Sequence, residues 1–382
     1  IAPMNRIFLL LFALDLTDSG GSRPGLPSGL PPMRNRHERA NYRRVPRSRQ
    51  TGSGLATAGV RHRGRASCAA EGDLPEKRIV RGRGFAQALL FRGAHRAPDP
   101  DMDIESLQQW IGRTERRSDV VTATPVAALS ATLDRDDPEP LPGTDLPPLW
   151  HWMYFAPLVR QSEIGADGHP KRGGFLPPVQ LPRRMWAGGR LEFHRALRVG
   201  DEITRESRIA DVRGKAGRSG SLVFVVVRHE IVDARGPAIT EEHDIVYRDD
   251  PAPGAATPEP RPAPAGAAFA REIVPDPVLL FRYSALTFNG HRIHYDRSYA
   301  TGVEGYPGLV VHGPLIATLL LDLLRRELPR TRVRRFEFRA VRPLFDIHRF
   351  TVCGRPDGDR AVQLWALDHQ GFLAMQATAW LP

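Results

Sequence analysis

Apolar and polar positions define two patterned regions in the second and third thirds of the chain. Residues 361–367 and 372–381 alternate between apolar and polar side chains and are separated by the turn residues Asp368 to Gly371. Alternation of this kind is typical of half-buried strands, and a short Gly-containing insert joins two strands as a hairpin. Residues 221–248 repeat the same order. The pattern therefore predicts a strand, a turn and a strand in each region.

One segment is apolar at nearly every position. Pro314 to Leu324 follows Gly313 and is closed by Arg325-Arg326-Glu327, and its length favours a helix over a strand. Near-continuous apolarity indicates burial on most sides, as for a helix enclosed by a curved antiparallel sheet. In the first region we expect its counterpart at residues 124–133, with Thr124 as the helix cap and Pro125 in the first turn.

The two regions also share similar segments. Leu191 to Arg198 resembles Phe336 to Arg342 if one residue is skipped. We therefore expect two copies of one unit, at residues 102–250 and 269–382. Residues 251–268, rich in Pro, Ala and Gly, have the composition of a semi-rigid linker. A helix followed by antiparallel strands, present twice, is an α+β architecture.

The positive charge is confined to the N-terminal part. The first 100 residues hold 18 Lys and Arg against 7 Asp and Glu, which accounts for the whole excess of 11. We expect residues 1–101 to be a disordered basic extension, because they lack apolar periodicity. Such a segment is either a nucleic-acid-binding arm or translated upstream of a natural start at Met102. The second reading is favoured, since the few aromatic residues form no series between the arginines, as a stacking platform would require, and no nucleic-acid partner is expected.

Cysteine use and hydropathy bear on the compartment. Cys68 and Cys353 provide neither a disulfide framework nor metal-ligand spacing, which fits a reducing environment. The apolar run Ile7 to Leu14 is too short to span a bilayer, and no convincing signal-peptide cleavage site follows it. We therefore expect a cytoplasmic protein with no membrane partner.

Polar groups concentrate in residues 281–296, where His291 and His294 lie near Asn289 and Asp296. A loop of this kind can present several side chains to one pocket, and it can equally be a solvated turn. The spacing of the two histidines differs from the i, i+4 pair of a zinc helix and no Cys is nearby, so no metal site is expected.

Residues 287–294 read Thr-Phe-Asn-Gly-His-Arg-Ile-His. This order resembles the signature of the MaoC-like hydratases, which is Ser or Thr, Gly, Asp, any residue, Asn, Pro, an aliphatic residue and His. The final His and the aliphatic residue match, and His312-Gly313 before an apolar helix also fits. Asn289 replaces the family's Asp. This version of the signature resembles that of the branch that contains the type 2 hydroxyacyl-thioester dehydratases and mesaconyl-CoA hydratase.

The resemblance implies a double hot-dog fold, with two curved antiparallel sheets, each wrapped around a central helix. It also implies hydration of an enoyl-thioester or dehydration of a 3-hydroxyacyl-thioester, with CoA as part of the substrate and no cofactor. His294 would be the acid/base, since a histidine has a reference pKa near 6.5. The N–H of Gly313, at a helix N-terminus, would bind the thioester oxygen.

Other roles follow from the same resemblance. Asn289 can orient a water molecule but cannot accept its proton, so either His294 acts alone or a carboxylate joins it. Asp296 is the nearest carboxylate, and a structural role is favoured for it. Tyr283, His291 and His312 are expected at the substrate.

The first copy has no histidine-bearing counterpart of residues 287–296, and is expected to bind the acyl-CoA rather than to catalyse. Its Arg190, Lys215 or Arg218 could meet the CoA phosphates. A thioesterase and a non-catalytic acyl-CoA-binding module are the alternative functions, and the missing Asp is the basis of the second. A homodimer is compatible with the fold. The acyl group, and CoA against an acyl carrier protein, remain open.

Overall fold

The computed structural model describes residues 103–217, 220–250 and 259–382, and the predicted extension lies outside them. The strands of the described residues form one sheet of ten. They are β1 (Thr114–Val120), β2 (Arg183–Phe193), β3 (Glu202–Gly217), β4 (Gly220–Asp233), β5 (Gly236–Arg248), β6 (Phe269–Ile273), β7 (Arg335–Ala340), β8 (Phe350–Pro356), β9 (Ala361–Leu367) and β10 (Leu373–Trp380). The two predicted strand-turn-strand units are β4–β5 and β9–β10, which confirms them.

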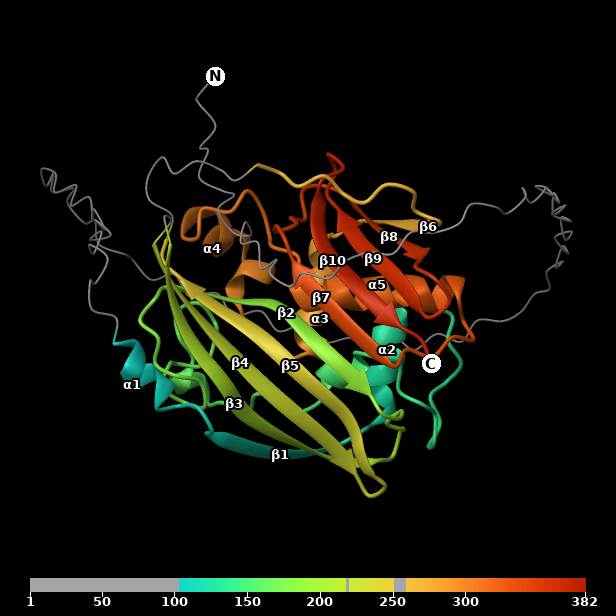
Figure 1. The fold of residues 1–382 in the computed structure, drawn as a ribbon, viewed down its shortest axis with the longest axis horizontal. Helices are drawn as coiled ribbons and strands as arrows, with labels where there is room; N and C mark the ends of the chain where they lie inside the picture. Colours follow the sequence, from blue (N-terminus) through green and yellow to red (C-terminus); the bar gives the residue numbers. More distant parts are fainter. Residues whose placement is uncertain (1–102, 218–219, 251–258) are drawn as a thin grey trace, which may run out of the picture. The chain divides into compact units, whose positions relative to one another are not determined.

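The order of the strands repeats. It runs β1-β3-β4-β5-β2 and then β7-β10-β9-β8-β6, so each strand of the first group has a counterpart in the second. The two groups lie side by side in Figure 1 and join where β2 pairs antiparallel with β7. At this seam Leu191 is the direct partner of Phe336, and these residues begin the two similar segments. The repeat in the sequence is therefore a local twofold relation in the fold.

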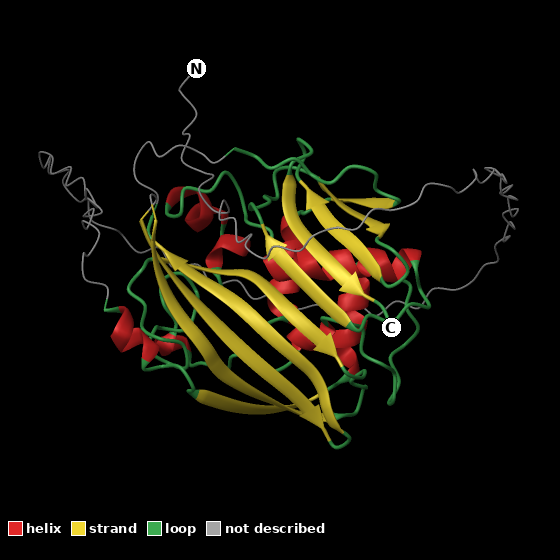
Figure 2. Cartoon of the chain, in the orientation of Figure 1, coloured by secondary structure: helices red, strands yellow, loops and turns green. Residues whose placement is uncertain are grey.

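Helices cover one side of the sheet (Figure 2). They are α1 (Ile104–Gln108), α2 (Ala123–Thr132), α3 (Pro277–Leu286), α4 (Arg297–Gly302) and α5 (Gly313–Glu327), with the 3-10 turns η1 (Trp150–Met153), η2 (Gln161–Glu163) and η3 (Arg292–His294). Every residue of α5 from Leu315 to Leu324 is buried, and the helix packs on β6, β8, β9 and β10. This confirms the predicted enclosed helix. Two such sheet-and-helix copies make the chain a double hot dog.

Two details of α2 differ from the expectation. The N-cap of the helix is Thr122, two residues before the expected Thr124, because β1 ends at Val120 and the chain enters the helix directly afterwards. The second difference concerns the counterpart of α2 in the second copy, which is α3 and not, as expected, α5. Each of these two ten-residue helices directly follows the first strand of its copy, and α2 packs on α3.

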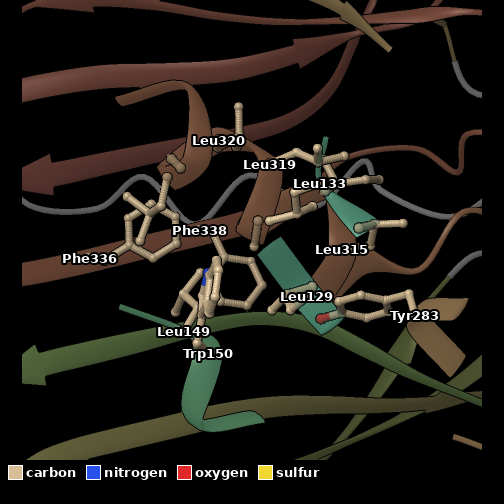
Figure 3. Packing of buried hydrophobic residues seen from close by; sticks show 14 of the residues in the cluster. Leu129, Leu133, Leu149, Trp150, Tyr283, Leu315, Leu319, Leu320, Phe336 and Phe338 are labelled. Atoms are coloured by element: carbon tan, nitrogen blue, oxygen red, sulfur yellow. The ribbon is translucent and has the colours of Figure 1, made fainter. Parts of the chain in front are cut away.

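Both copies contribute to one core. Figure 3 shows Leu129 of α2 and Leu133, which follows the end of that helix, beside Leu315 and Leu319 of α5. Phe336, at the seam, is fully buried in the same cluster. Removal of these apolar side chains from water stabilises the fold roughly in proportion to the buried area.

The predicted linker is only partly within the described residues. Arg261 and Ala268 bond through their backbones to Leu373 of β10 and Gly354 of β8, so residues 259–268 run along the second copy. No helix in the described parts of the chain has the length and apolar character needed to cross a membrane.

Candidate active site

The chain turns sharply between α3 and η3. Phe288 takes a left-handed conformation with φ of 50°, and the N–H of Asn289 donates to the carbonyl of Ser284 at 2.8 Å. The side-chain oxygen of Asn289 then accepts the backbone N–H of His291 at 3.0 Å. Asn289 therefore builds the turn that presents the two histidines, and its amide N–H groups remain donors.

His294 is held in one tautomer. Its Nδ1–H donates to the carbonyl oxygen of Val310 at 2.7 Å, so Nε2 carries the lone pair of the neutral ring. The residue is 8% exposed. Burial lowers the pKa of His294 to about 4, although the bond to Val310 acts in the opposite direction. At neutral pH this imidazole is a base that is ready to accept a proton.

The ring of His312 stacks on that of His294, with centroids 3.7 Å apart and planes inclined by 19°. Nε2 of His312 is hydrogen-bonded to Oγ of Ser284 at 2.8 Å, while Nδ1 is buried without a partner among the described residues. Burial lowers the pKa of His312 well below the usual histidine range. His312 is therefore a second neutral ring, placed directly before α5.

The helix α5 begins at Gly313, and no side chain caps it. The first N–H groups of a helix lack intrahelical partners and carry positive potential. A methyl group on Gly313 would have the backbone oxygen of Trp186 as its nearest neighbour, at 3.8 Å. The fold therefore does not require glycine at this position, and the absence of a side chain leaves the backbone N–H accessible to close approach.

Tyr283 and Asp296, both considered from the sequence, contact elements of the fold. Tyr283 lies in the core, its hydroxyl is bonded to Thr318 of α5, and its ring is 5.1 Å from that of His312. Asp296 caps α4 by accepting the N–H of Tyr299 at 3.0 Å and pairs with Arg292 at 2.7 Å. These contacts agree with the structural role favoured for Asp296.

A loop of the first copy docks onto this site. Residues 163–171 fold back on themselves, with Gly165 and His169 bonded through their backbones at 2.7 Å. Gly168, at φ of 89°, lies so near the second copy that a methyl group there would be 1.8 Å from the oxygen of Gly290. The N–H of Arg292 donates to the carbonyl of Asp167 at 2.9 Å. The backbones of the two copies are thus in direct contact.

This contact brings a carboxylate and a further histidine to the site. Nδ1–H of His169 donates to Asp167 at 2.9 Å, and the His169 ring lies 4.0 Å from that of His291. The His291 ring in turn lies 5.3 Å from that of His294. Burial lowers the pKa of His169 and of His291, whereas the bond to His169 holds the pKa of Asp167 below its usual range. The four residues therefore form a row of neutral rings that ends in an ionised carboxylate.

The same row contains potential metal ligands. Ligand-type atoms of Asp167, His169 and His291 all lie within 4.8 Å of one another. Sequence reasoning missed this group, because it joins two segments from different copies. The local signal that could have pointed to it is Gly165-Ala-Asp-Gly-His169, a histidine and a carboxylate separated by glycine in a loop.

Aromatic residues of the first copy meet near the N-terminus of α5. The rings of Trp152 and Trp186 are 5.0 Å apart, and His243 lies 3.9 Å from Trp186. The buried Glu241 accepts from Trp152 at 2.8 Å and from His151 at 2.9 Å. The buried carboxylate of Glu241 therefore fixes Trp152 and His151 in this aromatic cluster.

The arginines of β2 differ in their partners. Arg190, a candidate for the CoA phosphates, is instead bonded to Asp244 at 2.8 Å and to Glu242 at 2.8 Å. Arg184 is half-buried, and its charge lowers the pKa of His169 and of His291. Lys215 is exposed on β3, and Arg218 lies outside the described residues.

Known proteins resemble this chain in sequence. The family described as hydroxyacyl-thioester dehydratase type 2 matches residues 149–346, which include both loops of the site. The mesaconyl-C(4)-CoA hydratase of Chloroflexus aurantiacus is 50% identical over 272 residues, which cover 70% of this chain and 95% of that protein. The mitochondrial hydroxyacyl-thioester dehydratase type 2 of Schizosaccharomyces pombe is 28% identical over 280 residues, which cover 65% of this chain and 93% of that protein.

Solved structures show the same fold. HtdX of Mycobacterium tuberculosis matches with a TM-score of 0.50 and 18% identity, over 70% of this chain and 99% of that one. The MaoC-like dehydratase of Phytophthora capsici matches with a TM-score of 0.51 and 14% identity, over 73% of this chain and 99% of that one.

Proposed function

Because the chain belongs to the hydroxyacyl-thioester dehydratase type 2 family, within the MaoC-like hydratases, and is an acyl-CoA hydratase/dehydratase, we propose that His294 and the N-terminus of α5 carry its reaction. The observation that supports this best is the bond between His294 and Val310, which leaves Nε2 unprotonated. A neutral base beside an uncapped helix N-terminus is what hydration of a conjugated thioester needs.

Hydration breaks one O–H bond of water, forms a C–O bond at C3 and forms a C–H bond at C2. Nε2 of His294 accepts the proton of the attacking water and returns a proton to C2, so the enzyme ends unchanged. The N–H of Gly313 donates to the thioester oxygen while negative charge develops there. Asn289 orients the water by hydrogen bonds. The proposed steps use no cofactor, and CoA enters as part of the substrate.

We propose as substrate the CoA monothioester of a short, branched, unsaturated dicarboxylic acid of the mesaconyl type. The relative of this name is aligned over 95% of its length. Such a substrate carries a free carboxylate, which needs a cationic partner in a partly dry site. Arg184 of β2 is the suitable cation, because it is half-buried and acts electrostatically on both His169 and His291.

One chain supplies every residue of this site, so a homodimer would not be needed to complete it. The test is to add the enzyme to mesaconyl-CoA and follow the absorbance of the conjugated thioester while free thiol is measured in parallel. We expect the absorbance to fall with no thiol released. Release of free CoA would indicate a thioesterase, and no change with a panel of enoyl-thioesters would indicate a binding module.

A further inference from the structure

We propose that Trp152 and Trp186 of the first copy close the acyl end of the active site and limit the substrate to short acyl chains, with Glu241 as the residue that positions Trp152. The inference rests on the proposed function and deepens it, because it names the residues that exclude long fatty-acyl thioesters. It gives the first copy a part in the selection of the substrate.

The two tryptophans lie at the junction between the copies. The rings of Trp186 and Trp152 are 5.9 and 6.1 Å from that of Phe338 on β7. A methyl group on Gly189 of β2 would lie 3.0 Å from the Phe338 ring, so the missing side chain leaves room for that ring. Trp152, Trp186 and Phe338 therefore form a three-ring cluster over the strands that join the two copies.

The three-ring cluster is next to the proposed oxyanion donor. The backbone oxygen of Trp186 is the nearest neighbour of a methyl group placed on Gly313, at 3.8 Å. A thioester bound at the N–H of Gly313 extends in two directions, and its large, charged CoA part must reach solvent. Trp152 and Trp186 are only partly exposed and pack against the main hydrophobic core. The acyl group is therefore the part of the substrate that meets these rings.

A buried carboxylate holds the first tryptophan. Glu241 is 2% exposed and accepts the N–H of Trp152 at 2.8 Å. The same carboxylate accepts Nε2–H of His151 at 2.9 Å and Nε2–H of His243. Because these donors compensate a charged group that is out of water, displacement of the Trp152 ring would leave the carboxylate with one donor fewer. The ring of Trp152 is therefore a fixed part of the closed end.

The polar groups continue beyond Glu241. His243 lies 3.9 Å from the Trp186 ring, and its Nδ1 is hydrogen-bonded to Nε2 of His229 at 3.3 Å. Nδ1 of His229 is hydrogen-bonded to the hydroxyl of Ser207 at 2.8 Å, and both residues are buried. An alkyl chain that passed the rings would break these hydrogen bonds, whereas in an apolar interior it would be stabilised by burial. The interior of the first copy therefore favours a substrate that ends at the rings.

The closed end also suits the proposed carboxylate of the substrate. Arg184 and Trp186 are two residues apart on β2, so their side chains lie on the same face of the strand. Arg184 is half-buried. A short dicarboxylic acyl group that reaches the rings therefore has a cation for its terminal charge, whereas a long alkyl chain leaves that cation without a partner.

The test compares kcat/KM for crotonyl-CoA with kcat/KM for trans-2-octenoyl-CoA, which has a longer alkyl chain. We expect the parent enzyme to prefer crotonyl-CoA at least about 100-fold, and Trp152→Ala and Trp186→Ala each to reduce that preference about tenfold. Trp152→Phe keeps a ring but loses the N–H to Glu241, and it should reduce the preference by less, as should Glu241→Gln. A general loss of folded enzyme would lower both values together and leave their ratio unchanged.

Trp110→Ala is the matched control. Trp110 follows α1, its ring lies 4.2 Å from the guanidinium of Arg113, and it packs against a separate hydrophobic cluster around Val212. This variant should keep the preference of the parent enzyme. A shift in Trp110→Ala as large as that in Trp152→Ala would overturn the proposal, because the effect would then come from general loosening of the fold.

Two further outcomes would overturn the proposal. One is equal kcat/KM of the parent enzyme for the two substrates, and the other is an unchanged preference in both Trp152→Ala and Trp186→Ala. The dissociation constants of butyryl-CoA and octanoyl-CoA report the same closure without turnover. A parent enzyme that consumed no enoyl-thioester but bound butyryl-CoA more tightly than octanoyl-CoA would contradict the proposed function and support the closed end.

Discussion

Nδ1 of His294 lies 2.7 Å from the carbonyl oxygen of Val310, a residue 16 positions along the chain and just ahead of α5. The bond connects the turn η3, which carries His294, to the segment that leads into the helix. It therefore couples two features of the proposed mechanism, the tautomer of the base and the position of the oxyanion donor at Gly313. The stacked ring of His312, 3.7 Å from His294, holds the base from the other side.

Replacement of His294 tests the base directly. We expect His294→Ala to lose at least ~100-fold in kcat, the lower end for removal of an acid/base. His294→Asn, whose amide N–H can replace Nδ1–H toward Val310 but which cannot accept a proton, should lose as much. The exposed His194, bonded to Thr240, is the control, and His194→Ala should keep the parent kcat. Parent-like activity in His294→Asn would remove proton transfer from the role of this residue.

The pH dependence follows from burial of the same ring. Because the pKa of His294 is lowered to about 4, the base is neutral from neutral pH down to mildly acidic pH and becomes protonated only as the pH falls through that value. We expect kcat/KM at pH 5.5 to equal that at pH 7.5 in short assays. A histidine with the reference pKa near 6.5 would instead lose about tenfold over this interval. Such a loss would show that the base is not buried as described.

Gly313→Ala tests the proposed oxyanion donor without a loss of fold stability. The added methyl group meets only ordinary van der Waals contact, and alanine is favourable in a helix, so Tm should stay the same or rise slightly. We expect kcat/KM to fall about tenfold, because the methyl group lies where the thioester must approach the N–H. Gly302→Ala, at the end of α4 with open space around it, is the control. Full activity in Gly313→Ala would argue against the oxyanion role.

The strands and α5 could be predicted because alternation and continuous apolarity are local signals. The relation of α2 to α3 could not, since it depends on which strand each helix follows and on how the helices pack. The segment of His294 was found through an ordered motif of eight residues. Asp167 and His169 were missed, because their approach to His291 depends on a backbone contact between residues more than a hundred positions apart in sequence.

The proposed substrate class depends on Arg184. We expect Arg184→Gln to lower kcat/KM for mesaconyl-CoA about 10- to 100-fold, the effect of a lost hydrogen bond to a charged group. Crotonyl-CoA, which lacks the free carboxylate, should be affected much less. Arg190→Gln on the same strand is the control, since Arg190 is occupied by Asp244 and Glu242. Equal losses on both substrates would assign Arg184 to the fold rather than to the carboxylate.

The last prediction concerns stability, at the carboxylate of Asp322 within α5. Its side chain is 1% exposed and is bonded to Arg135 of the first copy at 2.7 Å and to Arg271 and Arg326 of the second at 2.9 and 2.8 Å. Removing one partner of a buried ionic group leaves the opposite charges uncompensated, which costs about 3 to 5 kcal/mol.

We expect Asp322→Ala to lose about 3 kcal/mol of the free energy of unfolding in urea, because the three arginines are partly solvated and recover some hydration. The exposed pair of Asp145 and Arg198 offers the control, and Asp145→Ala should cost less than about 1 kcal/mol. Since Arg135 and Asp322 belong to different copies, the loss should appear in a single unfolding transition. If Asp322→Ala destabilised only the second copy, two transitions would separate, and the copies would be independent in stability despite their shared sheet.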